Sequence, residues 1–129
     1  MKNEPRAPRV LAVVTSTGTE EQALDIAHAL VARRLAACVN ILPGVRSIFR
    51  WKGKVQQDGE FVLLVKTIET NFEAVRGVIK ELNAYELPEI VGFPAAEADA
   101  AFAAWVAESS TGVASGDDDE DEPGEATID

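Results

Sequence analysis

The stretch ACVNILPGVRSIFRWKGKVQQDGEFVLLVKT, residues 37–67, decides the fold. Its first half, Ala37 to Trp51, has the composition of a strand that Pro43-Gly44 interrupts. Because proline cannot donate a hydrogen bond to a ladder, we expect this strand to lie at a sheet edge or to be bulged there. Lys52-Gly53-Lys54 is a candidate tight turn, and Phe61 to Thr67 is the next strong strand. Two strands joined by a short glycine-containing turn predict an antiparallel hairpin.

A strand and a helix are predicted before this hairpin. Val10 to Thr17 is a short apolar run, typical of a buried strand. Thr19 and Gln22 then match a capping box, in which the hydroxyl accepts from the N3 amide and the N3 side chain reaches back. Apolar residues follow at helical spacing, and the stripe predicted to be buried contains Leu24, Ala27, Val31 and Leu35.

Two further helices and a strand are predicted after the hairpin. Thr70 and Glu73 form a second capping box. The apolar face of the helix that it starts contains Phe72, Val75, Ile79 and Leu82. Leu87 to Phe93 has the pattern of a fourth strand, and Asp99 can cap a short last helix. The apolar residues of that helix are Phe102, Trp105 and Val106.

The order of these elements is β-α-β-β-α-β with a C-terminal helix. This is the split βαβ, or ferredoxin-like, arrangement, an α+β fold with one antiparallel sheet and two helices on one face. Right-handed crossovers place the first and third strands side by side in the centre. The other sheet face is left uncovered, and an exposed apolar face usually marks a contact with another chain. We therefore expect the protein to be an oligomer.

The net charge of −10 is concentrated at one end of the chain. Eight of the 22 acidic residues lie in 117–129, which leaves 14 acids against 12 bases elsewhere. We expect a flexible N-terminus over residues 1–8, one folded domain over 9–110 and a disordered acidic tail over 111–129. Because the domain is nearly neutral, neither a nucleic acid nor a membrane surface is expected as a partner.

Cysteine usage and apolar runs indicate the compartment. Cys38 is the single cysteine, which excludes an internal disulfide and fits a reducing environment. The longest early apolar run, Val10 to Val14, is too short for a signal peptide or for a membrane span. The expected location is therefore the cytoplasm.

Several longer motifs occur along the chain in a distinctive order and spacing. They are Leu35 to Gly44, Ser47 to Gly53, Glu60 with Leu64 to Thr67, Tyr85 to Ile90, and Asp99 to Val106. Over about Val10 to Glu108 they resemble the signature of the CutA family of divalent-cation tolerance proteins. The resemblance implies a trimer similar in fold to the PII signalling proteins, and an association with tolerance of divalent metals, copper above all. It implies no settled catalytic activity.

One group of residues is a candidate ligand site. Glu60 and Lys66 have even spacing on the third strand, so both side chains point to one face. Such a pair lies either on a solvated face or in a cleft between subunits. The resemblance favours an intersubunit cleft that contains Trp51, Glu60, Lys66 and Tyr85.

The donors for copper are few. Cu(II) is held best by nitrogen and sulfur ligands, and the chain has one thiol, Cys38, and one imidazole, His28. His28 is expected on the flank of the first helix, with its edge in solvent. Cys38 is either a small buried residue or, through three-fold symmetry, one of three ligands on the trimer axis. Family members often carry His-Pro where this chain has Asn83-Ala84. No cofactor is required, and copper or another divalent cation is expected to bind only weakly.

These observations lead to one main functional hypothesis and two alternatives. The main hypothesis is a non-enzymatic homotrimer linked to divalent-metal (copper) tolerance, because no nucleophile–base pair or phosphate-binding loop is recognisable. The first alternative is a PII-like sensor that binds a small molecule or an anion in intersubunit clefts and signals to a partner protein. The second is a structural trimer that serves as a scaffold for a partner.

Overall fold

Two central strands and two edge strands form one antiparallel sheet in the computed structural model, which describes residues 8–112. β1 (Val10–Thr17) and β3 (Lys54–Ile68) pair in the centre, β2 (Cys38–Trp51) flanks β3, and β4 (Val91–Pro94) flanks β1. The order β2-β3-β1-β4 confirms that the first and third strands are neighbours and that the fold is ferredoxin-like. Most of the predicted flexible N-terminus and nearly all of the predicted acidic tail lie outside the described residues.

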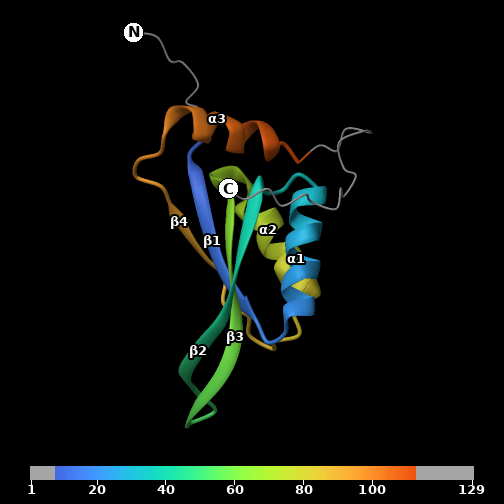
Figure 1. Cartoon of the computed structure of the whole chain (residues 1–129), viewed down its shortest axis with the longest axis vertical. Coiled ribbons are helices and arrows are strands. Elements are labelled where there is room, and N and C mark those ends of the chain that lie inside the picture. The colour runs from blue at the N-terminus through green and yellow to red at the C-terminus, as the bar shows by residue number, and fades with distance from the viewer. Residues whose placement is uncertain (1–7, 113–129) are drawn as a thin grey trace.

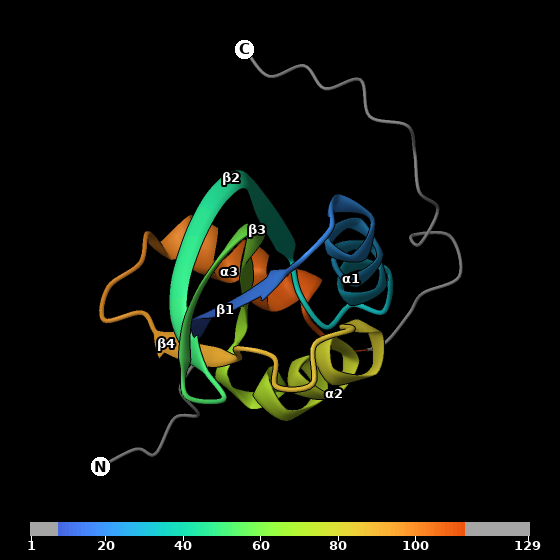
Figure 2. The same cartoon turned by 90° about the horizontal axis from the view of Figure 1, so that it is seen from below.

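Two helices cover one face of the sheet, and a third lies across its end. α1 (Glu20–Ala32) and α2 (Phe72–Leu82) pack on the same side, as Figure 2 shows. α3 (Ala100–Ser109) crosses the end at which β1 begins, opposite the projecting tip of the β2–β3 hairpin (Figure 1). Among residues 8–112, no helix combines the length and the apolar character that a membrane span needs.

The main core lies between the sheet and the α1–α2 layer. Its fully buried members include Val13, Ile26, Leu30, Leu63, Val65, Val75 and Ile79. A smaller cluster lies under α3 and contains Val10, Ala37, Ile68 and Val106. Since α3 reaches only this end of the sheet, no helix of residues 8–112 lies over the remainder of the face opposite α1 and α2 (Figure 1).

The hairpin has the predicted interruption and the predicted turn. Lys52 and Gly53 at its tip both have positive φ, 52° and 80°. The register of β2 against β3 shifts between Leu42 and Val45, where Gly44 has a φ of 72°. This confirms the bulge at Pro43-Gly44, because proline cannot donate to the ladder there. β3 is longer than predicted, beginning at Lys54, since pairing with β2 holds its polar first half in strand conformation.

The predicted buried stripe of α1 is wrong by one position. Leu24 and Val31 are 43% and 42% exposed, whereas Ala23, Ile26 and Leu30 are fully buried. Both sets recur at helical spacing, so periodicity alone does not distinguish them. Packing against α2 and the sheet buries the set that contains Ala23, Ile26 and Leu30.

Local capping was predicted with mixed success. Thr19 Oγ1 accepts from the Gln22 amide at 3.2 Å, as expected, but the Gln22 side chain accepts from the Ala84 amide at 3.3 Å instead of closing the box. Asp99 caps α3 by accepting from the Phe102 amide at 3.0 Å, which confirms that prediction.

The second predicted capping box is absent. Thr70 lies in a short 3₁₀ turn, Glu69–Asn71, and α2 begins at Phe72 without a side-chain cap bond. The Asn71 amide instead donates to the carbonyls of Leu35 and Ser110, at 3.2 and 2.8 Å. These tertiary bonds hold the start of α2 against the ends of two other elements, and they replace the local cap.

The fourth strand is shorter than predicted. β4 covers Val91–Pro94 and not Leu87 to Phe93, because residues 85–90 form an irregular segment between α2 and the sheet. Pro88 has no N–H to donate to a neighbouring strand, which is consistent with pairing that starts only after it.

The identity of the buried face of α1 can be tested by a matched pair of substitutions. Ile26→Ala should lower the free energy of unfolding by about 2–5 kcal/mol, because it opens a cavity in the core. Leu24→Ala should cost less than about 1 kcal/mol, since that side chain is nearly half exposed. Chemical denaturation of the two variants measures both values. An equal loss of unfolding free energy in the two variants would contradict the burial of Ile26 and the exposure of Leu24.

Candidate functional site

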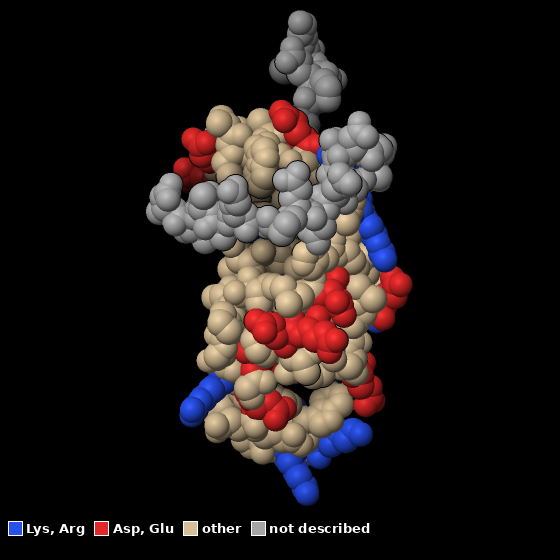
Figure 3. Space-filling view, turned by 45° about the vertical axis from the view of Figure 1, so that its right-hand side comes forward, with Lys and Arg blue, Asp and Glu red and all other residues tan. Residues whose placement is uncertain are grey.

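A hollow of about 680 Å³ lies where the outer part of the hairpin meets the segment that follows α2. Its lining comes from four parts of the chain: Ser16 at the end of β1, residues 47–51 of β2, Gln56, Asp58 and Glu60 of β3, and residues 84–87 with Glu89. Figure 3 shows the surface hollowed above the hairpin end, with acidic side chains around the opening.

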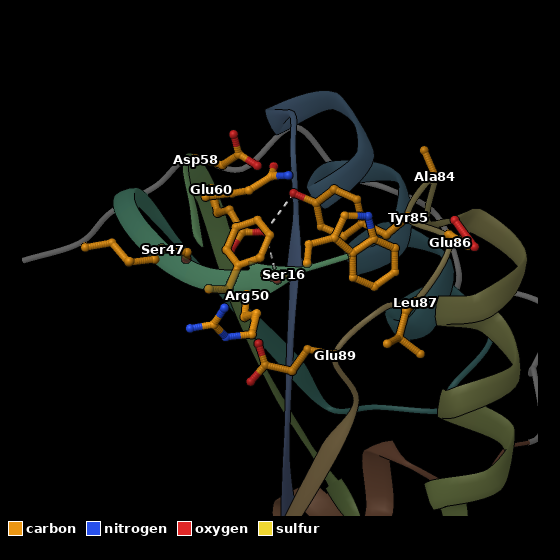
Figure 4. A pocket seen from close by; sticks show the side chains of 14 residues that line it. Ser16, Ser47, Arg50, Asp58, Glu60, Ala84, Tyr85, Glu86, Leu87 and Glu89 are labelled. Carbon is orange, nitrogen blue, oxygen red and sulfur yellow. Dashed lines mark hydrogen bonds between the residues drawn. The ribbon is translucent and has the colours of Figure 1, made fainter. Parts of the chain in front are cut away.

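A hydrogen-bonded group forms the base of this hollow. Glu60 Oε2 accepts from the Tyr85 hydroxyl at 2.6 Å and from the Ser16 hydroxyl at 3.2 Å (Figure 4). Ser16 is only 4% exposed, so its hydroxyl is held below the opening. Gly18 lies against the tyrosine ring, and a Cβ at that position would come within 3.2 Å of the Tyr85 oxygen. The fit leaves no room for a larger residue without movement of the ring.

Asn83 connects the Tyr85 segment to the sheet. Its side-chain amide donates to the Ser16 carbonyl at 2.9 Å, and its side-chain oxygen accepts from the Tyr85 amide at 2.9 Å. Asn83 is buried, and its bond to the Ser16 carbonyl is made away from bulk solvent. Asn83 therefore positions Tyr85, and it is not among the residues that line the hollow.

The environment of Tyr85 keeps its hydroxyl protonated. Burial raises the pKa of Tyr85 well above its ordinary value, and the hydrogen bond to Glu60 and the charges of Glu60 and Asp58 raise it further. At neutral pH the phenol is consequently a donor to the Glu60 carboxylate. It is not available as a base.

The four predicted cleft residues divide between two places. Trp51, Glu60 and Tyr85 line the hollow together. Lys66 shares the sheet face of Glu60 but lies six residues farther along β3, about 20 Å away at the rise of a strand. Its ammonium donates to Asn40 Oδ1 on β2, so Lys66 is not part of the hollow. Whether the hollow faces another subunit stays a prediction.

Cys38 and His28 lie apart from the hollow. Cys38 is half-buried at the start of β2, opposite Lys66 in the ladder, and His28 is exposed on α1. Within residues 8–112, no three His, Cys, Asp or Glu side chains come together as a group that could hold a metal ion. The donor set of the described part of the chain therefore does not form a closed copper site, and the proposed role of Cys38 would need other copies.

Several residues of the hollow were not predicted from the sequence. Asp58 and Glu60 have the same even spacing on β3 that linked Glu60 to Lys66, so alternation was a usable signal for Asp58. Ser16 and Glu89 gave no local signal, because they join the hollow only through tertiary contacts.

Comparisons with known proteins match most of the chain to one family. The family described as CutA1 divalent ion tolerance protein matches residues 11–109. The divalent-cation tolerance protein CutA of Thermus thermophilus is 46% identical over 98 residues, which cover 76% of this chain and 95% of that protein. Human protein CutA is 34% identical over 97 residues, which cover 75% of this chain but only 54% of the human protein.

The solved structures that superimpose on this chain come from the same family as these relatives. The Thermus thermophilus divalent cation tolerance protein superimposes with a TM-score of 0.76 at 45% identity, covering 78% of this chain and 97% of that one. The structure described as the periplasmic divalent cation tolerance protein CutA from Archaeoglobus fulgidus has a TM-score of 0.76 at 34% identity. The superposition covers 78% of this chain and 98% of that one.

The hydrogen bond to Glu60 can be tested by titrating Tyr85, the single tyrosine of the chain. Its phenolate absorbance should appear well above pH 10 in the folded protein and near about pH 10 in denaturant. Since the folded pKa is the higher one, the stabilisation is present below the unfolded pKa and is lost as pH rises through the folded value. Glu60→Gln should lower the folded pKa. A folded pKa near the ordinary value would contradict the hydrogen-bonded site.

Proposed function

This chain belongs to the CutA1 divalent ion tolerance family, and we propose that it acts in divalent-metal tolerance as a non-enzymatic homotrimer. The observation that supports the assembly is the uncovered face of the sheet. We also propose a cytoplasmic location, on the strength of the single cysteine.

The uncovered face has apolar side chains in consecutive rows of the ladder, with one hydrogen-bonded polar pair, Lys66 and Asn40, among them. Leu64, Val14 and Val91 lie side by side across β3, β1 and β4, on the side away from α1 and α2. Phe93 and Leu42 extend this face toward the two sheet edges and are 54% and 41% exposed. A contiguous apolar surface of this kind is unusual on a monomer. Contact with other copies would remove it from water, and a three-fold arrangement is the one that the family resemblance implies.

The assembly can be tested by two substitutions of equally exposed valines. Val91→Glu places a carboxylate on the uncovered face, whereas Val31→Glu places one on the outer surface of α1; both valines are 42% exposed. Native mass spectrometry of the parent protein should give a species of three times 13.8 kDa. Val91→Glu should dissociate it at micromolar concentration, because a buried unpaired carboxylate is costly.

The control variant, Val31→Glu, should remain trimeric. A parent protein that is monomeric at micromolar concentration would contradict the proposed assembly. Dissociation of both variants to the same extent would contradict the assignment of the uncovered face as the interface.

Weak Cu(II) binding is part of the proposed function. Its donors are mainly carboxylates, which bind Cu(II) with little selectivity beyond the usual order of affinities. We expect calorimetry to give a micromolar or weaker dissociation constant. Cys38→Ser should change that constant by less than about tenfold, which is about 1.4 kcal/mol. A nanomolar site that disappears with Cys38→Ser would contradict this expectation and would indicate a thiolate cluster formed by several copies.

A ligand sensor is a second candidate function, and the hollow is the observation that favours it. Its base is formed by groups from β1, β3 and the segment after α2, so an occupant would contact elements that are distant in the sequence. Its acidic lining disfavours an anion and leaves a small neutral or cationic molecule as the ligand. Signalling would then require a partner protein.

A further inference from the structure

The hollow has the dimensions of a small-molecule site. Its volume of about 680 Å³ falls within the roughly 300–1,000 Å³ of typical ligand pockets. Glu60 at its base is held by two donors on a single oxygen, Oε2. Because Ser16 and Tyr85 fix this carboxylate before any ligand arrives, little ordering is needed when it accepts a further hydrogen bond.

Charge selects the sign of the ligand. Four carboxylates line the hollow, from Asp58, Glu60, Glu86 and Glu89, against one guanidinium, that of Arg50. The Arg50 group donates to the Gly53 carbonyl at 3.4 Å, and across residues 8–112 none of the four carboxylates forms an ion pair with a lysine or arginine. Their combined field therefore favours a cation.

The placement of the carboxylates indicates the shape of that cation. Asp58 and Glu60 belong to β3, while Glu86 and Glu89 belong to the segment after α2, on the opposite wall. Figure 4 shows Asp58, Glu86 and Glu89 on different sides of the pair formed by Tyr85 and Glu60. No three of these carboxylates converge as a metal ion requires. A compact divalent ion would thus meet one or two of them, whereas an extended molecule can reach both walls.

The walls between the carboxylates are aromatic and apolar. Phe49 and Trp51 of β2 face the segment that carries Tyr85 and Leu87. Aromatic rings attract ammonium groups by their quadrupole and also pack against methylene chains. The ligand that matches alternating carboxylates and apolar walls has separated ammonium groups on an aliphatic chain.

We propose that the hollow binds a linear aliphatic polyamine, with its ammonium groups on the carboxylates of the two walls and its methylene chain along the aromatic side chains. The polyamine proposal names the ligand class of the sensor function. It rests on that proposed function for the consequence of binding, and not for the binding itself. The carboxylates and the aromatic side chains that it uses all line the hollow.

Calorimetric titration of the full chain with putrescine and spermidine tests the proposal. Butanediol is the matched probe without charge, and Mg²⁺ is the matched probe without an aliphatic chain. We expect spermidine to bind at least as tightly as putrescine, butanediol to show no binding, and Mg²⁺ to bind about tenfold more weakly than putrescine. Trp51 fluorescence in a Trp105→Phe background should change on binding, because Trp51 lines the hollow and Trp105 lies on α3.

Matched variants separate the hollow from diffuse attraction to acidic residues. Asp58→Asn and Glu89→Gln should each weaken spermidine binding about two- to fivefold, the effect of one exposed charge pair. Glu97→Gln removes an exposed carboxylate on the loop before α3 and should leave binding unchanged. Equal losses in all three variants, or equal affinities for Mg²⁺ and putrescine, would overturn the proposal.

Native mass spectrometry of the same samples distinguishes failure of the polyamine site from failure of the proposed trimer. A monomer that binds spermidine with these variant effects would leave the polyamine site standing and would contradict the trimer. A trimer that binds no polyamine would overturn the site alone.

Discussion

β3 runs for 15 residues, whereas β1, its neighbour in the centre of the sheet, runs for eight. The inner half of β3 therefore has a strand on both sides, and its outer half pairs only with β2. The outer half of β3 can extend past β1 because β2 continues beside it. The tight turn at Lys52-Gly53 joins the two strands, and their pairing resumes after the bulge at Pro43-Gly44. The space beside the outer half of β3, past the end of β1, is where the hollow forms.

The segment after α2 occupies that space because polar side chains hold it there. Asn83 bonds to β1 and to the Tyr85 amide, and Tyr85 bonds to Glu60 on β3. The resulting site is polar at its base and aromatic along its sides. Its position is set by hydrogen bonds that are buried or partly buried, and their loss would leave polar groups without partners.

Two surfaces of the molecule thus differ in chemistry. The uncovered sheet face is mostly apolar across β3, β1 and β4, with Lys66 as a charged exception, and it supports the proposed assembly of copies. The hollow is acidic and aromatic, and it supports the proposed binding of an organic cation. They meet at Glu60, which shares its sheet face with Leu64 and lines the hollow, so occupation of the hollow and contact between copies would act on the same strand.

The sequence by itself determined the order of the elements, the hairpin with its bulge and turn, and the caps at Thr19 and Asp99, because all of these depend on contacts within a few residues. The tertiary structure alone decided which face of α1 is buried, since Ala23 and Leu24 begin stripes of equal periodicity.

It also decided where the side chains of the candidate site meet. Alternation along β3 places Glu60 and Lys66 on one face. Only the end of β1 and the path of the segment after α2 bring Ser16 and Tyr85 to Glu60, bring Glu89 to the hollow, and leave Lys66 with Asn40. These contacts join residues that are far apart in the chain, and no local pattern carries information about how such segments pack.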